Sequence, residues 1–409
     1  ADSDVTLTGN VEIDGAVAID TSAGTDGDIT FSSTINAEGT GSNTESLSVS
    51  SGTGTITLGV VGGTTGLDSF VVNSSALTIS NNITTANGLI DINAPVSLGA
   101  DVTISSGSGN GNVEFSSTIA GTQNLDILSG SGAITITGNI GTGGTPLTSL
   151  DINQTGGTGS INILGNIGTD TASGAGIVRI GNDGTTGTIT FGTSGTAGDY
   201  FTTGAQTYIA DEYSLLGTDP DFNASSENIK FEDGGNGMTL ATAADLTVDT
   251  GSGENGNIVI EAPISGTSDG STTTITLEAG SGSVSVAGMG TDIGIVTIDG
   301  SGGVTLNGNI TTNGGNIDIN EVTTLGGAVA LTTAGGTVDF ASTINGNENF
   351  DISSGSGAVS IGGIIGGDTA LATLDINNSS GTGAITLNDI GDTNTQGVTG
   401  TSNIGNTTT

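Results

Sequence analysis

Short apolar–polar–apolar triplets recur along this chain and limit its fold more than any other feature. Leu125-Asp126-Ile127 is followed by Ile134-Thr135-Ile136, and equivalent triplets return 25 to 27 residues later as Leu150-Asp151-Ile152 and Ile161-Asn162-Ile163. Successive side chains of a strand point to opposite sides, so each triplet predicts a short strand with two buried side chains. Glycines end most triplets and permit sharp turns. The pattern predicts a coil of three short strands per 21 to 27 residues.

Such a coil cannot bury its inner side chains by itself. A stack of coils can, because the leucine, isoleucine and valine side chains then form one continuous apolar column. Backbone hydrogen bonds would run between coils about 4.8 Å apart. We therefore expect an all-β fold, a right-handed parallel β-helix (β-solenoid).

The chain also contains a long internal duplication. Residues 126–141 and 351–366 are identical at eleven of sixteen positions, and residues 78–93 and 305–320 at ten of sixteen. The second copy corresponds to about residues 76–182, displaced by about 225 positions.

This duplication suggests three regions. Residues 1–197 form a first solenoid array, and residues 236–409 form a second array. Residues 198–235 break the triplet pattern and are expected to be an irregular insertion or a distorted coil.

Composition excludes several fold and function classes. Glycine makes up 75 of the 409 residues, which disfavours helix, and the regular spacing of apolar residues argues against disorder. The chain lacks Cys, His and Trp, and Arg179 and Lys230 are its only basic residues. It therefore lacks a histidine base, a cysteine nucleophile and a Cys/His zinc site, and we expect no enzyme. The net charge of −40 disfavours binding to nucleic acids, and no apolar run is long enough to insert into a membrane.

Several segments resemble a known family. The strings GGVTLNGNITTNGGNIDIN, VEFSSTIAGTQNLDILSGSGAITI and VDFASTINGNENFDISSGSG are similar to repeats of bacterial β-strand-repeat, filamentous-haemagglutinin-like surface proteins. The resemblance covers nearly the whole chain. It implies a parallel β-helix in a secreted or cell-surface adhesin or fibre, and hence an extracellular location.

Carboxylates are the candidate metal ligands. Asp20, Asp26 and Asp28 lie in one acidic loop, and Asp219 and Asp221 lie in another. Calcium prefers oxygen ligands of this kind, so Ca²⁺ is the candidate cofactor.

The aspartates of the Leu-Asp-Ile strands should stack one coil apart on the outer face. These pairs are Asp126 with Asp151 and Asp351 with Asp375. Two interpretations stay open: cations bridge the stacked carboxylates, or salt screens a solvated face.

Aromatic residues gather in one segment. Tyr200, Tyr208, Tyr213 and Phe222 lie between residues 198 and 233, in a chain with only 3% aromatic residues. They pack either as a local core or as an interface with a neighbouring subunit or glycan, since tyrosine is enriched at interfaces. The sequons at Asn82 and Asn309 are expected by chance in so Asn- and Thr-rich a chain.

The two ends of the solenoid bear on its function. The second copy stops where the first continues into Thr188-Ile189-Thr190-Phe191, and neither end carries an evident cap. Open strand edges invite pairing with another chain. We expect an extracellular filament, sheath or surface fibre whose partner is itself, stacked head to tail, or flanking parts of a longer chain. The alternative is an adhesin that binds glycans or cell surfaces through residues 198–233. A β-helix glycoside hydrolase is a third, weaker hypothesis, because stacking aromatics are scarce.

Overall fold

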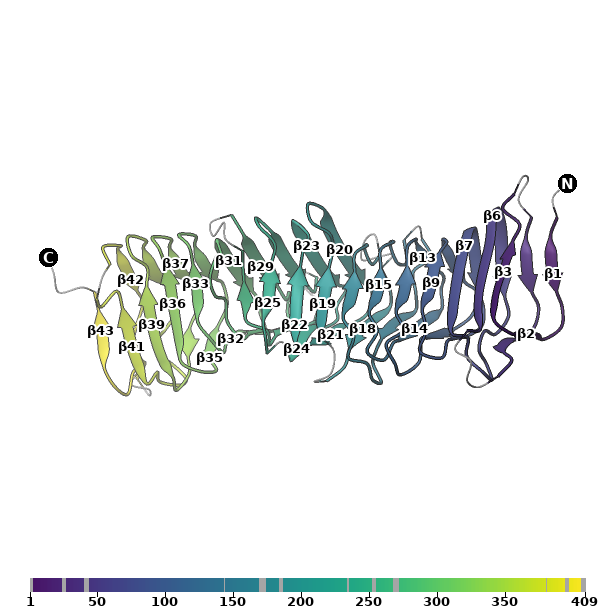
Figure 1. The fold of residues 1–409 in the computed structure, drawn as a ribbon. Coiled ribbons are helices and arrows are strands. Elements are labelled where there is room, and N and C mark those ends of the chain that lie inside the picture. The colour runs from purple at the N-terminus through teal and green to yellow at the C-terminus, as the bar shows by residue number, and fades with distance from the viewer. Residues whose placement is uncertain are drawn as a thin grey trace. The chain divides into compact units, whose positions relative to one another are not determined.

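The computed structural model is all-β, and its strands stack as a parallel β-solenoid, which confirms the predicted fold class (Figure 1). The structure describes residues 3–23, 27–39, 44–142, 144–168, 174–183, 187–233, 235–251, 255–267, 272–379, 381–393 and 397–405. It contains two compact units. Unit 1 comprises residues 1–193 and 199–211, and unit 2 comprises residues 194–198 and 212–409. No helix among the described residues has the length and apolar character needed to span a bilayer.

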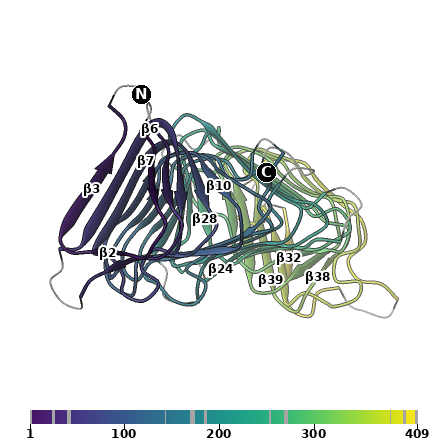
Figure 2. The same cartoon turned by 90° about the vertical axis from the view of Figure 1, so that its right-hand side faces the viewer.

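Unit 1 has three faces, each a column of parallel strands that pair with the turn before and the turn after. Figure 2 shows β2 and β3 on different sides of the first turn. Face A comprises β3 (Ala16–Asp20), the first parts of β6 (Ser46–Leu58) and β7 (Ser69–Ile79), β9 (Ile90–Asn93), β12 (Val113–Phe115), β15 (Ile134–Ile136), β17 (Ile161–Ile163) and β19 (Thr188–Phe191). Face B comprises β1 (Val5–Leu7), β4 (Ile29–Phe31), the second parts of β6 and β7, β10 (Val96–Leu98), β13 (Ile119–Ala120) and β20 (Ala197–Thr202, in this unit from Asp199). Face C comprises β2 (Val11–Ile13), β5 (Ile35–Ala37), β8 (Ile83–Thr84), β11 (Val102–Ser105), β14 (Asn124–Leu128), β16 (Ser149–Ile152), β18 (Ile177–Gly181) and β21 (Gln206–Ala210).

Unit 2 repeats this three-faced plan. Face D comprises β22 (Glu212–Leu215), β25 (Met238–Leu240), β28 (Ile264–Ser265), β33 (Ile310–Thr312), β36 (Val329–Thr333), β39 (Asn349–Ser353), β41 (Thr373–Ile376) and β43 (Ser402–Ile404). Face E comprises β23 (Asp219–Ala224), β26 (Asp245–Asp249), β29 (Thr274–Glu278), β31 (Ile295–Asp299), β34 (Ile317–Ile319), β37 (Val338–Phe340), β40 (Val359–Ile361) and β42 (Ile385–Leu387). Face F comprises β24 (Ile229–Asp233), β27 (Ile258–Ile260), β30 (Val284–Val286), β32 (Val304–Leu306), β35 (Thr323–Leu325) and β38 (Ile344–Asn345).

Strand alternation builds the core as the sequence predicted. In β15, Ile134 and Ile136 are fully buried, while Thr135 between them is partly exposed. Each apolar side chain stacks on its counterpart one turn away, as Ile134 does on Ile161. The interior is therefore a continuous apolar column within each unit.

Hydroxyl side chains stabilise one corner of the turns by hydrogen bonds to the backbone. The buried Ser129 donates a hydrogen bond to the carbonyl oxygen of Gly132 (2.7 Å), and Ser354 does the same to Gly357 (2.6 Å). These bonds satisfy polar groups that would otherwise be buried without a partner at a tight bend. The two residues occupy equivalent positions in the duplicated segments, so both copies use the same corner.

Glycines at this corner allow the turns to approach closely. A Cβ at Gly357 would overlap the carbonyl oxygen of Gly336, and a Cβ at Gly383 would overlap that of Gly357. Gly132 and Gly159 form the same kind of contact in unit 1. Glycine is therefore required at each position of this row, because any side chain would push neighbouring turns apart.

Candidate functional site

Stacked carboxylates form ladders on the outer faces, as the triplet pattern predicted. In unit 1, Asp126 of β14 pairs in register with Asp151 of β16, and Arg179 of β18 follows. The Arg179 guanidinium grips Asp151 with two parallel bonds, Nε to Oδ1 at 2.6 Å and Nη2 to Oδ2 at 2.7 Å. Partial burial and the Asp151 charge still raise the pKa of Asp126, although Arg179 opposes that rise.

The equivalent ladder in unit 2 has an amide in place of the cation. Asp351 of β39 stacks on Asp375 of β41, and Asn403 of β43 donates from Nδ2 to Asp375 Oδ1 at 2.5 Å. Burial and then the neighbouring Asp375 raise the pKa of Asp351.

Face E carries two more ladders. Glu278 lies between Asp249 and Asp299, and Asp318 stacks on Asp339. Burial raises the pKa of Glu278 and of Asp318, and the adjacent carboxylates add to both shifts. Each of these groups is easier to protonate in the folded protein than in a solvated chain.

We expect the ladders to make the protein more stable in mild acid. A carboxyl group with a raised pKa binds more protons when folded than when unfolded, so the free energy of unfolding increases as pH falls from neutral toward the ordinary values of 3.8 for Asp and 4.5 for Glu. In stronger acid the trend reverses. The hydrogen bonds from Ser22 to Asp20 and from Thr55 to Asp28 lower the pKa of those two carboxyls, and their contribution is lost as pH falls through the lowered values.

Urea unfolding followed by circular dichroism across this pH range measures the effect. Asp318→Asn and Asp351→Asn should flatten the mild-acid rise, because each removes one of the groups that takes up a proton. A rise that both variants leave unchanged would show that the ladders are not its source.

The carboxylates proposed as calcium ligands lie at strand ends and within β23. The Asp20 carboxylate accepts hydrogen bonds from the backbone and hydroxyl of Ser22 (2.8 and 2.6 Å), and Asp28 accepts two from Thr55 (2.7 and 2.9 Å). Asp26 lies outside the described residues. In β23, Asp219 is exposed and Asp221 is half-buried. Among the described residues, no three acidic side chains come together in a cluster that could hold a metal ion.

Three aromatic residues of one turn of unit 1 lie inside the solenoid. Phe191, Tyr200 and Tyr208 come from faces A, B and C of one turn, and the Phe191 ring centroid is 5.0 Å from each tyrosine ring. Gln206 donates from Nε2 to the Tyr200 carbonyl (2.8 Å) and accepts from the Tyr208 hydroxyl (3.0 Å). Burial raises the pKa of both tyrosines, so they stay neutral.

Aromatic side chains also fill the interior of the first turn of unit 2. Phe231 makes edge-to-face contacts with Tyr213 (5.4 Å) and Phe222 (5.0 Å), and the three rings come from faces F, D and E. The Tyr213 hydroxyl donates to the Glu232 carbonyl oxygen. The four aromatic residues predicted as an interface, Tyr200, Tyr208, Tyr213 and Phe222, are 0–1% exposed. Their side chains therefore fill the interior of their own turns, and residues 198–233 supply β20 to β24.

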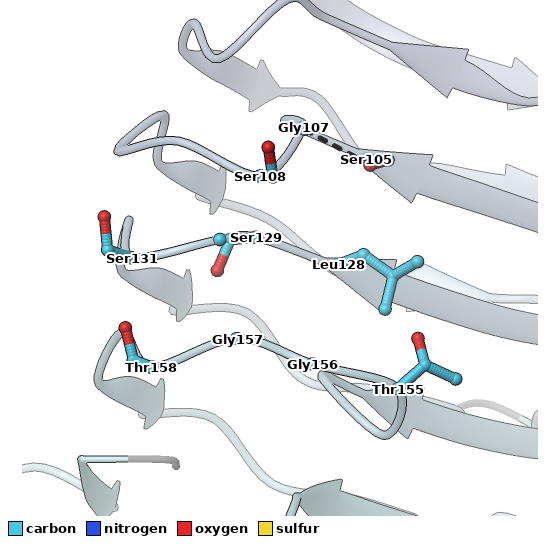
Figure 3. A pocket seen from close by; sticks show the side chains of 11 residues that line it. Ser105, Gly107, Ser108, Leu128, Ser129, Ser131, Thr155, Gly156, Gly157 and Thr158 are labelled. Atoms are coloured by element: carbon cyan, nitrogen blue, oxygen red, sulfur yellow. Dashed lines mark hydrogen bonds between the residues drawn. The ribbon is translucent and has the colours of Figure 1, made fainter.

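A shallow groove of about 460 Å³ lies on unit 1 beside the corner that Ser129 holds (Figure 3). Ser108, Ser131 and Thr158 come from three successive turns, and their hydroxyl groups line one side of the groove. Leu128 and several glycines complete the lining. The groove offers hydroxyl and backbone groups to a ligand and no charged side chain.

Asparagine and aspartate side chains link successive turns in a way that the sequence analysis missed. Asn139 lies just before a core isoleucine, and its Oδ1 accepts the backbone N–H of Asn166, the equivalent residue one turn later (3.0 Å). Asn166 in turn accepts the N–H of Asp199 (3.3 Å). We call this contact, in which an Asn or Asp side chain accepts a backbone N–H of the next turn, an Asx clasp. It recurs from Asp4 to Asp28, Asp28 to Thr55, Asn82 to Thr103, Asn112 to Ala133, Asn228 to Asn257, Asn257 to Ser283, Asn309 to Ala330 and Asn316 to Thr337.

Every Asx clasp named here points the same way along the chain. The acceptor belongs to the earlier turn and the donor to the later one. The sequence signal is an Asx residue directly before a strand, and two of these residues, Asn82 and Asn309, had been noted only as sequons.

The last described turn of unit 2 exposes apolar side chains that its duplicate in unit 1 buries. Ile404 is 42% exposed and Ile390 is 38% exposed, whereas the equivalent Ile180 and Ile167 are both 0% exposed. In unit 1, the next turn covers these residues, since Ile180 pairs with Tyr208 and Ile167 with Tyr200. The edge strands β42 and β43 thus present backbone groups and apolar surface of the kind that a further turn covers.

Comparison with known proteins adds no family to this description: no protein-family model, no curated protein and no solved structure matches the chain.

Proposed function

We propose that this protein is an extracellular structural protein, a subunit or segment of a β-solenoid filament, sheath or surface fibre that extends by end-to-end strand pairing. The observation that carries this proposal is the stack of parallel strands in which each turn covers the apolar side chains of the turn before, as Tyr208 covers Ile180 and Tyr200 covers Ile167. An interface that joins unlike ends does not close on itself and produces an open fibre.

Three further features support a structural role. Parallel pairing of identical short strands provides the same hydrogen bonds between copies as within one copy. The lateral faces carry hydroxyl groups and carboxylates, and a net charge of −40 opposes sideways aggregation. The resemblance to surface-fibre repeats favours the same function. Calcium would act in this proposal as a screening or bridging cation on the carboxylate ladders.

An adhesin that binds through residues 198–233 has less support. In that segment, five of the six aromatic side chains are buried, and Phe201 is partly exposed. The hydroxyl-lined groove on unit 1 is the surface that this alternative would use to bind glycans.

Sedimentation velocity of the purified chain at about 0.15 M salt tests the proposal, because that salt screens repulsion beyond about 8 Å. We expect species heavier than the 39.3 kDa chain, growing with protein concentration. Ile404→Lys should abolish them, since it places a charge on the apolar edge. Ile295→Lys is the matched control: Ile295 is also 42% exposed but lies on the lateral face E, and this variant should assemble normally.

Two results would overturn the proposal. One is a wild-type chain that stays monomeric with and without added Ca²⁺. The other is an equal loss of assembly in Ile295→Lys and Ile404→Lys, with native circular dichroism in both.

A further inference from the structure

Seven asparagines of this chain directly precede a glycine, a pairing in which the asparagine side chain is prone to deamidation. Glycine has no Cβ, so its backbone nitrogen can approach the side-chain carbonyl carbon of the preceding asparagine. The surroundings of each pair in the fold decide whether these two groups can meet. The seven asparagines are Asn87, Asn110, Asn236, Asn255, Asn307, Asn313 and Asn345.

Hydrogen bonds hold the side chains of four of these asparagines. Asn345 is 6% exposed, and its Oδ1 accepts the backbone N–H of Asp368 (3.0 Å). Asn307 donates from Nδ2 to the Ser285 hydroxyl (3.0 Å) and to a backbone carbonyl oxygen (3.3 Å). Two more Oδ1 atoms accept hydrogen bonds, those of Asn87 (from Gly109) and Asn255 (from Ser281).

Close packing restrains the glycine in two further pairs. The glycines that follow Asn110 and Asn236 are both buried. A Cβ on the first would lie 2.4 Å from the Gly88 carbonyl oxygen, and a Cβ on the second would lie 2.9 Å from that of Pro263. A backbone so closely packed against a neighbouring turn cannot readily move its nitrogen toward the asparagine side chain.

Asn313 and Gly314 differ from the other six pairs. Both residues are exposed, and a Cβ on Gly314 would meet nothing within 4 Å. Within the described part of the chain, neither the Asn313 side chain nor the Gly314 N–H makes a hydrogen bond. The Asn313 backbone is nevertheless anchored, because its N–H donates to the Ile293 carbonyl oxygen of the previous turn (2.8 Å). The two reacting groups are therefore open to solvent and free to meet.

We propose that Asn313–Gly314 is a self-modification site at which the folded chain deamidates. Solvent hydroxide removes the proton of the Gly314 N–H, and the nitrogen attacks Cγ of Asn313. The new N–Cγ bond closes a succinimide ring as the Cγ–Nδ2 bond breaks, and Nδ2 leaves as ammonia with a proton from water, which regenerates hydroxide. A water molecule then opens the ring at either carbonyl and gives aspartate or isoaspartate at position 313.

The product would add a negative charge to a hollow of unit 2. Asp292 directly precedes Ile293, on which Asn313 is anchored, so two carboxylates would then lie on neighbouring turns. Isoaspartate would also lengthen the backbone of its turn by one methylene group. The modification goes beyond the proposed structural function and does not depend on assembly. The hollow has a volume of about 350 Å³, and its lining includes Thr291, Asp292, Thr311, Asn313 and Thr332.

Peptide mapping after timed incubation in mildly alkaline buffer tests this inference. Cleavage at Glu278 and Glu321 releases residues 279–321, which contain both Asn307 and Asn313 and hence an internal control. In the folded chain, fragmentation mass spectrometry should find deamidation at Asn313 at least about tenfold faster than at Asn307, whose two hydrogen bonds must break first. In guanidinium chloride, the two rates should become similar.

Two variants identify the reacting side chain by the release of ammonia. Asn313→Gln should abolish the fast phase, because the longer side chain would have to close a larger ring. Asn307→Gln is the matched control and should leave that phase unchanged, with native circular dichroism in both variants.

Three results would overturn the inference. The first is an equal rate at Asn307 and Asn313 in the folded chain. The second is an Asn313 that stays intact in the folded chain over a time in which the unfolded chain reacts. The third is an equally strong preference for Asn313 in guanidinium chloride, since the fold would then not be its cause.

Discussion

Gly357→Ala is expected to lower the free energy of unfolding of unit 2 by on the order of 3 kcal/mol or more. The new methyl group would overlap the Gly336 carbonyl oxygen, and the row continues because Gly383 packs equally closely on Gly357. The clash involves backbone on both sides, so no side-chain rotation can relieve it. The turns would have to separate, at the expense of the hydrogen bonds between them.

Urea unfolding monitored by circular dichroism measures the loss, and hydrogen exchange locates it. Exchange should accelerate first in β37, β40 and β42, since each turn contacts only its neighbours. Gly290→Ala is the control in the same unit, because a Cβ at Gly290 would meet only the Ile264 carbonyl oxygen at 3.6 Å, an ordinary contact. Equal stability of the two variants would refute the steric account of the glycine row.

Phe231→Ala should destabilise unit 2 by about 3–5 kcal/mol, as expected for a buried phenylalanine. Phe231 is 0% exposed and is the ring that contacts both Tyr213 and Phe222. Its removal would leave a cavity at the centre of the turn and end two edge-to-face contacts, each worth about 0.5–1.5 kcal/mol beyond burial.

Lys230→Ala on the same strand provides the comparison. Lys230 points outward, and its 3.4 Å ion pair with Glu232 is partly exposed, so this variant should change stability by less than about 1 kcal/mol. Chemical denaturation of both proteins distinguishes the cases. A small effect of Phe231→Ala would mean that neighbouring side chains collapse into the space, contrary to the close packing described here.

The stacking of turns could be predicted from the sequence, because a period of two fixes which side chains point inward. The repeat offset then determines which residues stack, and Asp126 does pair with Asp151. The long strands β6 and β7 were not foreseen. The stretch Ser50 to Thr55 contains two glycines and resembles a corner, yet the strand passes through it with only two register shifts.

The aromatic residues show what composition leaves open. Their concentration in one segment was compatible with a local core or with a contact surface, and Tyr200 and Phe222 occupy inward positions of alternating strands. Whether an aromatic side chain is buried depends on whether its position in the strand faces inward, and not on its residue type. The Asx clasps were visible as Asn–Ile pairs, but their meaning depends on register between residues 21 to 33 positions apart. Only the folded stack brings those residues together.

The Asx clasp has an evolutionary consequence. Because the acceptor and the donor occupy the same position in consecutive turns, loss or gain of one whole turn by recombination would leave a new neighbour with the matching group already in place. Corner loops tolerate variation as well, since the clasped residues are separated by 21 positions at Asn82 and 33 at Asn166. Lineages carrying this protein should therefore differ in the number of turns far more readily than in the chemistry that joins them.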